Sequence, residues 1–193
     1  MSVVVVVKKK NEIVIASDTL TSMGSLRLSA DFKENNLARR KFFEYNGTFI
    51  GSVGRAMTKI MLRHALRNVD HTLNCDGLDN IYSSLLELHK ILKEEYYLVP
   101  GKGQGTAVEN TNFHLLIANK SGIYEVTGDR YVSELSKFWA IGSGMPYALG
   151  AMSAVYDKKK YSAEDIARVG VEAACAFDKS CDLPMDLAKI TLD

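Results

Sequence analysis

The chain has 193 residues, of which 47% are hydrophobic and 24% charged, so length and composition predict one globular domain over residues 1–193. Its 24 Lys and Arg residues balance 23 Asp and Glu residues, and a net charge of +1 excludes bulk attraction to nucleic acid or to a membrane surface as the main activity. No stretch approaches the roughly 18 uncharged residues of a membrane span. The three cysteines lack the spacing of a disulfide framework or a zinc site. We therefore expect a cytoplasmic protein with free thiols, no metal and no cofactor.

Two apolar runs near the start predict a buried hairpin. Val3–Val7 and Ile13–Ala16 are separated by a polar segment, and neither run alternates with polar residues. Because an unbroken apolar strand is buried on both faces, the sheet is expected to be covered on each side. Leu26–Ala30 alternates apolar and polar residues, which predicts an edge strand or the arm of a loop.

The next segment predicts a second hairpin and two helices. Asn46-Gly47 is a strong signal for a tight turn between strands over Phe42–Tyr45 and Thr48–Ile50. Spacings of three and four residues then predict the buried faces of two helices. The first face consists of Met57, Ile60, Met61 and His64, and the second of Leu78, Ile81, Tyr82, Leu85, Leu86, His89 and Leu92.

The second half of the chain repeats this order of strands followed by helices. We expect, in sequence, a loop over 99–110, strands over 112–118, 122–126 and 137–141, a helix over 146–156, a helix that begins at a capping box from Ser162 to Asp165, and a closing strand over 187–192. Strands and helices do not alternate as they would in a doubly wound fold. The expected fold class is therefore α+β, a four-layer αββα sandwich of two antiparallel sheets flanked by helix pairs.

Four groups of residues resemble the proteasome β-subunit and HslV family of N-terminal-nucleophile hydrolases, and they occur in the family's order. They are Ser2 to Asp18 with Gly24, Tyr45-Asn46-Gly47 with Ile50–Gly54, Ala140–Gly144 with Pro146-Tyr147-Ala148, and Ser162–Ala167. The resemblance covers nearly the whole chain and implies the αββα fold of this superfamily. It departs from the family at the nucleophile, where Ser2 stands in place of Thr.

The resemblance implies that Ser2 is the nucleophile once Met1 has been removed. A hydroxyl is a weak nucleophile until a base takes its proton, and the α-amine of a leading residue supplies that base. Its reference pKa of about 7.7 to 8.0 lies near the operating pH. Asp18 matches the family's buried Asp and would hold the terminus through charge-assisted hydrogen bonds.

Two supporting positions have more than one candidate. The family has an active-site Lys beside its nucleophile. Lys41 matches it by residue type, but a shifted gap would place Arg40 or Arg39 there. Either Asp178 or Asp182 would supply a supporting acid near the closing loop.

The resemblance also implies roles for four further residues. The Gly51 N–H would donate to the oxyanion of the tetrahedral intermediate, and the Ser143 hydroxyl would orient the terminal amine. Leu20 and Ser22 would bind an extended peptide through their main chain.

The function implied is a peptidase that hydrolyses peptides or unfolded proteins inside a ring-shaped homo-oligomer, with an ATP-dependent unfoldase as a possible partner. One alternative is a ring-forming homologue with little or no activity that acts as a scaffold or chamber. The replacement of Thr by Ser2 favours that alternative. A second alternative is an amidase of the same fold that acts on a small molecule.

Overall fold

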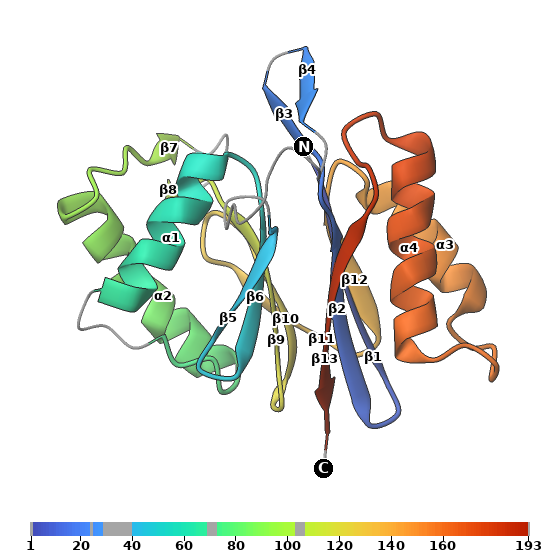
Figure 1. The fold of residues 1–193 in the computed structure, drawn as a ribbon. Coiled ribbons are helices and arrows are strands. Elements are labelled where there is room, and N and C mark those ends of the chain that lie inside the picture. The colour runs from blue at the N-terminus through green and yellow to red at the C-terminus, as the bar shows by residue number, and fades with distance from the viewer. Residues whose placement is uncertain (1, 24, 29–39, 69–72, 103–106, 193) are drawn as a thin grey trace.

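The computed structural model describes residues 2–23, 25–28, 40–68, 73–102 and 107–192. Its main strands form two antiparallel sheets that stack face to face, and one pair of helices covers the outer face of each sheet (Figure 1). This arrangement confirms the expected αββα sandwich. None of the helices in these ranges has the length and apolar character that crossing a membrane requires.

The first sheet contains the N-terminal strand and has the order β12-β1-β2-β13. Its strands are β1 (Val3–Lys9), β2 (Glu12–Asp18), β12 (Phe138–Gly142) and β13 (Met185–Thr191). Helices α3 (Met145–Val155) and α4 (Ala163–Phe177) pack on its outer face (Figure 1).

The valine run of β1 divides its side chains between two cores. Val3, Val5 and Val7 pack against α3 and α4, whereas Val4 and Val6 face the other sheet. All five side chains are fully buried. Because consecutive side chains of a strand point to opposite faces, a strand covered on both sides has no position for a polar residue.

The second sheet has the order β11-β10-β9-β6-β5. Its strands are β5 (Phe42–Tyr45), β6 (Thr48–Val53), β9 (His114–Asn119), β10 (Gly122–Val126) and β11 (Val132–Leu135). Helices α1 (Ala56–Asn68) and α2 (Leu78–Glu94) cover its outer face (Figure 1). Asn46 and Gly47 both have positive φ, at 47° and 72°, as a two-residue turn of type I′ requires.

Two short hairpins complete the described chain. The strands β3 (Thr21–Met23) and β4 (Leu26–Leu28) form an arm beside the N-terminal end of β1 (Figure 1). The strands β7 (Gly101–Lys102) and β8 (Glu109–Asn110) pair within the segment that was expected to be a loop. The predicted capping box is present, since the Ser162 side chain accepts the N–H of Asp165 and the Asp165 side chain accepts the N–H of Ser162.

The buried faces predicted for the first two helices are partly wrong. Met57 and Ile60 on α1 are 65% and 48% exposed. The buried apolar residues of α1 are instead Leu62, Ala65 and Leu66. The apolar spacing predicts one inward face, but this helix carries apolar residues on its outer side as well.

The same correction applies to α2. Ile81, Leu85 and Leu92 are buried as predicted, whereas the predicted core positions Leu78, Tyr82 and Leu86 are 40%, 45% and 44% exposed. The face predicted to be buried on α2 therefore includes residues from both the inner and the outer side of the helix. Both helices of this layer present large apolar side chains to the outside.

Candidate active site

Asp18 ends β2 and is completely buried, yet four donors surround its carboxylate. Oδ1 accepts the Val3 N–H at 2.8 Å and the Lys41 Nζ at 2.6 Å. Oδ2 accepts the N–H of Leu20 at 3.2 Å and that of Asp182 at 3.3 Å. A buried charge is costly unless it is paired and hydrogen-bonded, and this carboxylate is both.

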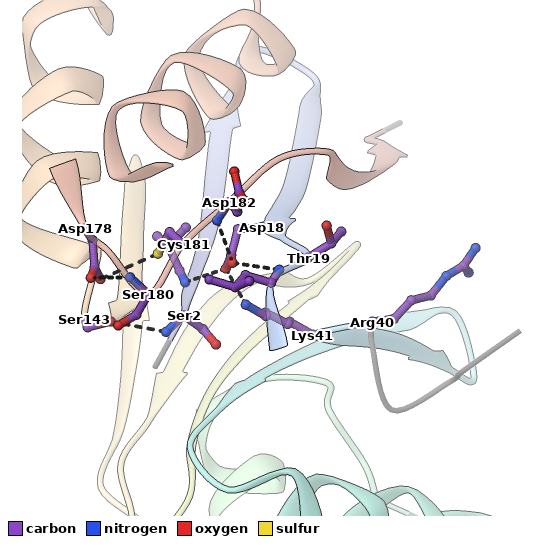
Figure 2. A network of polar contacts seen from close by, with 12 residues as sticks. Ser2, Asp18, Thr19, Arg40, Lys41, Ser143, Asp178, Ser180, Cys181 and Asp182 are labelled. Atoms are coloured by element: carbon purple, nitrogen blue, oxygen red, sulfur yellow. Dashed lines mark hydrogen bonds and ion pairs between the residues drawn. The ribbon is translucent and has the colours of Figure 1, made fainter. Parts of the chain in front are cut away.

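The structure brings Lys41, rather than its neighbours, to Asp18. Lys41 lies immediately before β5, and its side chain is only 6% exposed. Arg40 is exposed, and its side chain points away from Asp18 (Figure 2). Arg39 lies outside the described residues. Of the three candidates, Lys41 is therefore the one that the structure places beside Asp18 within the described residues.

Ser2 is held on both sides by the segment after β12. Its N–H donates to the Ser143 Oγ at 3.2 Å, and its carbonyl oxygen accepts the Gly144 N–H at 3.3 Å. Gly142 has a φ of +99°, and a Cβ at this position would collide with the Ser2 carbonyl oxygen. Glycine is therefore required for this segment to approach Ser2 so closely.

Behind Ser143 lies a second, partly buried set of polar contacts, centred on Asp178. The Asp178 carboxylate accepts the Ser180 N–H at 2.9 Å and the Cys181 thiol at 3.6 Å, and it also accepts the Ser143 hydroxyl (Figure 2). Burial alone would raise the pKa of Asp178, but the hydrogen bonds from Ser143, Ser180 and Cys181 together lower it. Burial raises the pKa of the Cys181 thiol, which therefore keeps the proton that it donates.

The two candidate acids have different places in this arrangement. Asp178 reaches Ser143 through its carboxylate. Asp182 contributes its backbone N–H to Asp18, while its carboxylate pairs with Arg27 on the surface at 2.8 Å. Sequence reasoning missed Cys181, because a cysteine without a partner of metal or disulfide spacing was read as a free thiol.

Ser2 lines an open pocket with a volume of about 100 Å³. The other lining residues are Leu20, Thr21, Ser22, Lys41, Ser52, Val53, Gly54, Arg55, Ala56 and Lys59. Leu20 and Ser22, the predicted peptide-binding residues, are both among them. The Leu20 N–H is occupied by Asp18, so of its main-chain groups only the carbonyl remains for a ligand.

Gly51 does not line this pocket. It lies within β6 opposite Phe42 of β5 and Leu116 of β9. The Ser52 N–H donates to the Lys41 carbonyl at 2.7 Å, on the β5 side, and successive N–H groups of a strand point to opposite sides. The Gly51 N–H is thus directed into the ladder with β9. The part of this segment that reaches the pocket is Ser52 to Gly54.

Comparison with known proteins decides the family. No known protein-family profile matches the chain. Two solved structures of BPH from Thiobacillus denitrificans, a bacterial proteasome homologue, are each 37% identical and cover 99% of this chain. The chain covers 99% of the BPH in complex with epoxomicin, at a TM-score of 0.89, and 98% of the other, at 0.90.

The chain belongs to the proteasome and HslV-like family of N-terminal-nucleophile hydrolases. A eukaryotic HslV from Trypanosoma brucei has the same fold, with a TM-score of 0.71 at 20% identity over 98% of this chain and 99% of its own. The resemblance inferred from the four sequence groups is therefore confirmed. Within the described ranges, no three His, Cys, Asp or Glu side chains gather as they would around a metal ion.

Proposed function

We propose that this protein is a peptidase that uses Ser2 as its N-terminal nucleophile once Met1 has been removed. One observation carries the proposal: a completely buried Asp18 forms an ion pair of 2.6 Å with Lys41, and Lys41 and Ser2 line the same pocket. A desolvated ion pair beside a hydroxyl contributes weakly to stability. Such a pair is the means by which active sites fix a positive charge next to a reacting atom.

In the first step, the α-amine of Ser2 takes the proton of its own hydroxyl, directly or through one water molecule. The Ser2 Oγ then bonds to the carbonyl carbon of the peptide, and the carbonyl oxygen becomes an oxyanion. The Lys41 ammonium favours the neutral, proton-accepting form of the amine and the developing negative charge. Ser143 accepts a hydrogen bond from the Ser2 nitrogen and so fixes the direction of its lone pair.

In the second step, the carbon–nitrogen bond of the substrate breaks and the ammonium of Ser2 returns the proton to the departing amine. The acyl group stays on Oγ as an ester. A water molecule, deprotonated by the same α-amine, hydrolyses that ester and regenerates Ser2. The Gly54 N–H, at the end of this backbone, is the proposed donor to the oxyanion in place of Gly51, because Gly54 lines the pocket whereas the Ser52 N–H already donates to the Lys41 carbonyl.

Self-association into a ring is the second part of the proposal. Large apolar side chains on the outer side of α1 and α2, among them Met57, Ile60 and Tyr82, are between 45% and 65% exposed. Exposed apolar patches of this kind are typical of protein–protein contacts. A chamber closed by such contacts would restrict access to unfolded chains, which an ATP-dependent unfoldase would supply.

Epoxomicin provides the test, because a BPH structure 37% identical to this chain contains it. The purified protein is incubated with epoxomicin, and its intact mass is measured before and after. We expect a chain that lacks Met1 and gains the mass of one inhibitor, together with loss of hydrolysis of a fluorogenic peptide. A chain that keeps Met1, is not labelled and hydrolyses no peptide would overturn the proposal.

Ser2→Ala is the control variant. It removes the hydroxyl but leaves the Ser143 and Gly144 contacts, which involve the backbone of residue 2. We expect no labelling, no hydrolysis and an unchanged melting temperature. A ring that assembles but neither hydrolyses peptides nor reacts with epoxomicin would favour the scaffold alternative. Monomers that hydrolyse small acyl-amides would favour the amidase alternative.

A further inference from the structure

Two runs of three lysines, Lys8–Lys10 and Lys158–Lys160, lie side by side in the folded chain, although 149 positions separate Lys9 from Lys158. The first run ends β1 and enters the turn before β2, and the second lies between α3 and α4. This turn is at the end of the sandwich opposite the N-terminus (Figure 1). A site here is therefore separate from the pocket beside Ser2.

Lys9 joins the two runs. Its Nζ donates to the carbonyl oxygens of Tyr156 at 2.6 Å, Lys158 at 3.1 Å and Tyr161 at 2.8 Å. An ammonium group has three donors, so these bonds use all of them. The carbonyl groups are neutral, so they fix the position of the ammonium group without cancelling its charge.

The acids beside the two runs are paired with other cations. Glu12 lies 3.9 Å from the Lys189 Nζ, and Asp157 lies 3.8 Å from the Lys137 Nζ. Among the residues that the structure describes, no acid forms an ion pair with either lysine run. Without these six lysines the chain would have 18 basic residues against 23 acidic ones. The positive charge of the protein is therefore concentrated at this end of the fold.

Both runs line one pocket with a volume of about 330 Å³. Lys9, Lys10, Lys159 and Lys160 contribute to its walls, and Glu12 is the only acid that does so within the described ranges. A concave surface lined mainly by one sign of charge raises the local concentration of the opposite ion. Four ammonium groups against one carboxylate therefore favour an anionic ligand.

The turn that presents Lys10 has an unusual backbone. Lys10 has a φ of +54°, in the left-handed region that glycine and asparagine adopt most readily. The other tight turn of the fold has Asn46 and Gly47 at its positive-φ positions. A lysine in this conformation gives up the less strained residue in exchange for an ammonium group at the pocket. Backbone strain of this kind is typical of binding sites.

The lining favours phosphate groups over the other common anions. It contains lysines but no arginine, whose planar fork suits the paired oxygens of a carboxylate, among the residues described. Neither run carries or adjoins a large exposed apolar side chain, which binding into a membrane surface would require. The volume is at the small end of ligand pockets, whereas a nucleic-acid duplex needs an interface of about 1,000 Å² or more.

We propose that this pocket binds a compact polyphosphate, either the phosphate chain of a nucleoside triphosphate or inorganic tripolyphosphate. Lys10, Lys159 and Lys160 bind the phosphate oxygens, and Lys9 holds the two runs together. Such a site is additional to the proposed peptidase and does not depend on it.

Calorimetric titration of the full chain at low ionic strength tests the ligand class. Tripolyphosphate and ATP should both bind, AMP should bind about tenfold or more weakly, and added salt should weaken all three. Equal affinities for tripolyphosphate and ATP would identify the phosphate chain alone as the ligand, and tighter binding of ATP would identify a nucleotide; both support the site. No binding of either would overturn the proposal. Tighter binding of a hexaglutamate peptide than of tripolyphosphate would also overturn it, in favour of an acidic protein partner.

A double variant assigns the binding to residues. Lys159 and Lys160 are exposed, so Lys159→Gln/Lys160→Gln should fold normally and bind tripolyphosphate about tenfold or more weakly. Arg67→Gln/Lys90→Gln is the matched control, because it removes two exposed cations from α1 and α2. It should leave the affinity within about twofold. An equal loss in the two double variants would indicate attraction by the overall charge and would contradict a site.

Lys10→Gly separates binding from stability. Glycine adopts the positive φ without strain, so the melting temperature should stay the same or rise, while affinity for tripolyphosphate should fall severalfold. Thermal unfolding and calorimetry measure the two quantities. Unchanged affinity would remove Lys10 from the site and overturn the explanation of its backbone.

Discussion

Ser2 lies between two regions of very different character. On one side, the ends of β1 and β2 and the segment 178–182 form a closed set of contacts in which Asp18 and Asp178 each accept several hydrogen bonds. On the other side, the end of β6 and the start of α1 form an open pocket lined by cations and hydroxyls. The first region is built to keep atoms in place, and the second leaves room for a ligand. In the proposed peptidase, chemistry and recognition would therefore depend on separate parts of the fold, and substitutions should affect them separately.

The largest effect is expected from Lys41→Met, which leaves Asp18 buried without its cation. We predict a loss of about 3–5 kcal/mol in the free energy of unfolding and a fall in hydrolysis on the order of a thousandfold. Denaturant unfolding and peptide hydrolysis measure the two quantities. The double variant Asp18→Asn/Lys41→Met removes both charges, so it should regain much of the stability and none of the activity. Activity that returned with stability would mean that Lys41 has only a structural role.

Asp178→Asn tests the part of the closed region that acts through Ser143. The amide cannot accept as the carboxylate does, so Ser143 loses the partner that orients it. We predict a reduction of kcat by about ten- to a hundredfold with little change in KM, because binding takes place on the other side of Ser2. Asp182→Asn is the matched control, since that carboxylate pairs with Arg27 on the surface, and it should retain kcat. An equal effect of the two substitutions would contradict the distinction.

The same carboxylate predicts a dependence of stability on pH. The pKa of Asp178 is lowered in the folded protein, so its contribution to stability is present above the ordinary value of about 3.9 and is lost as the pH falls through the lower, folded value. The difference in unfolding free energy between the native protein and Asp178→Asn should therefore shrink below about pH 4. Urea unfolding between pH 2.5 and 7 measures this difference. A difference that grew toward acidic pH would show that the shift has the opposite sign.

Two glycines on or beside α3 have opposite surroundings: Gly144 is tightly packed behind Ser2, and Gly150 lies on the surface of the helix. A Cβ at Gly144 would lie 2.7 Å from the Ala174 Cβ and 3.0 Å from the Cys181 Sγ, whereas at Gly150 it would meet nothing within 4 Å. We predict that Gly144→Ala destabilises the fold by about 1–3 kcal/mol and lowers activity. Gly150→Ala should stabilise it by about 0.5–1 kcal/mol. Thermal unfolding measures the melting temperatures of both variants. Equal changes in melting temperature would indicate that the segment before α3 can move to accommodate the added methyl group.

The smallest change in stability is expected on the outer side of α1. Ile60 is 48% exposed, so Ile60→Ser should alter the unfolding free energy of the isolated chain by no more than about 0.5 kcal/mol. If this surface joins copies of the chain, the same substitution should reduce assembly, which native mass spectrometry measures. Leu62→Ala, at a buried position of the same helix, should cost about 2–5 kcal/mol. Assembly unaffected by Ile60→Ser would exclude this part of α1 as a contact.

The elements that could be predicted are those whose pattern has one physical explanation. The valine run of β1 requires cover on both faces, Asn46-Gly47 requires a tight turn, and Ser162 with Asp165 requires a helix start. The strand β11 was missed because it is short and contains polar residues, so neither alternation nor an apolar run distinguishes it from a loop. The outward apolar residues of α1 and α2 were assigned to the core because a single sequence does not say which of two apolar faces is inside.

The site shows a similar division. Ser2 and Asp18 were predictable through the resemblance to the family, and the fold places Ser2 immediately before β1 and Asp18 at the end of the neighbouring strand β2. The choice between Asp178 and Asp182 depends on which of the two carboxylates the segment after α4 brings to Ser143, and no local sequence pattern encodes that contact. Cys181 was missed because its role depends on its contact with Asp178, and the sequence left the choice between Asp178 and Asp182 open.

The fixed position of the Ser2 nitrogen has a practical consequence for work with this protein. In the proposed mechanism, anything joined to that nitrogen turns the amine into an amide, which has no basic lone pair, so an affinity tag at the front of the chain should abolish hydrolysis until a processing protease removes it. Leu192, by contrast, bonds to the β1–β2 turn at the opposite end of the sandwich (Figure 1). A label attached after it would report on assembly without touching the chemistry, and a removable leader would make an enzyme that can be switched on at a chosen moment.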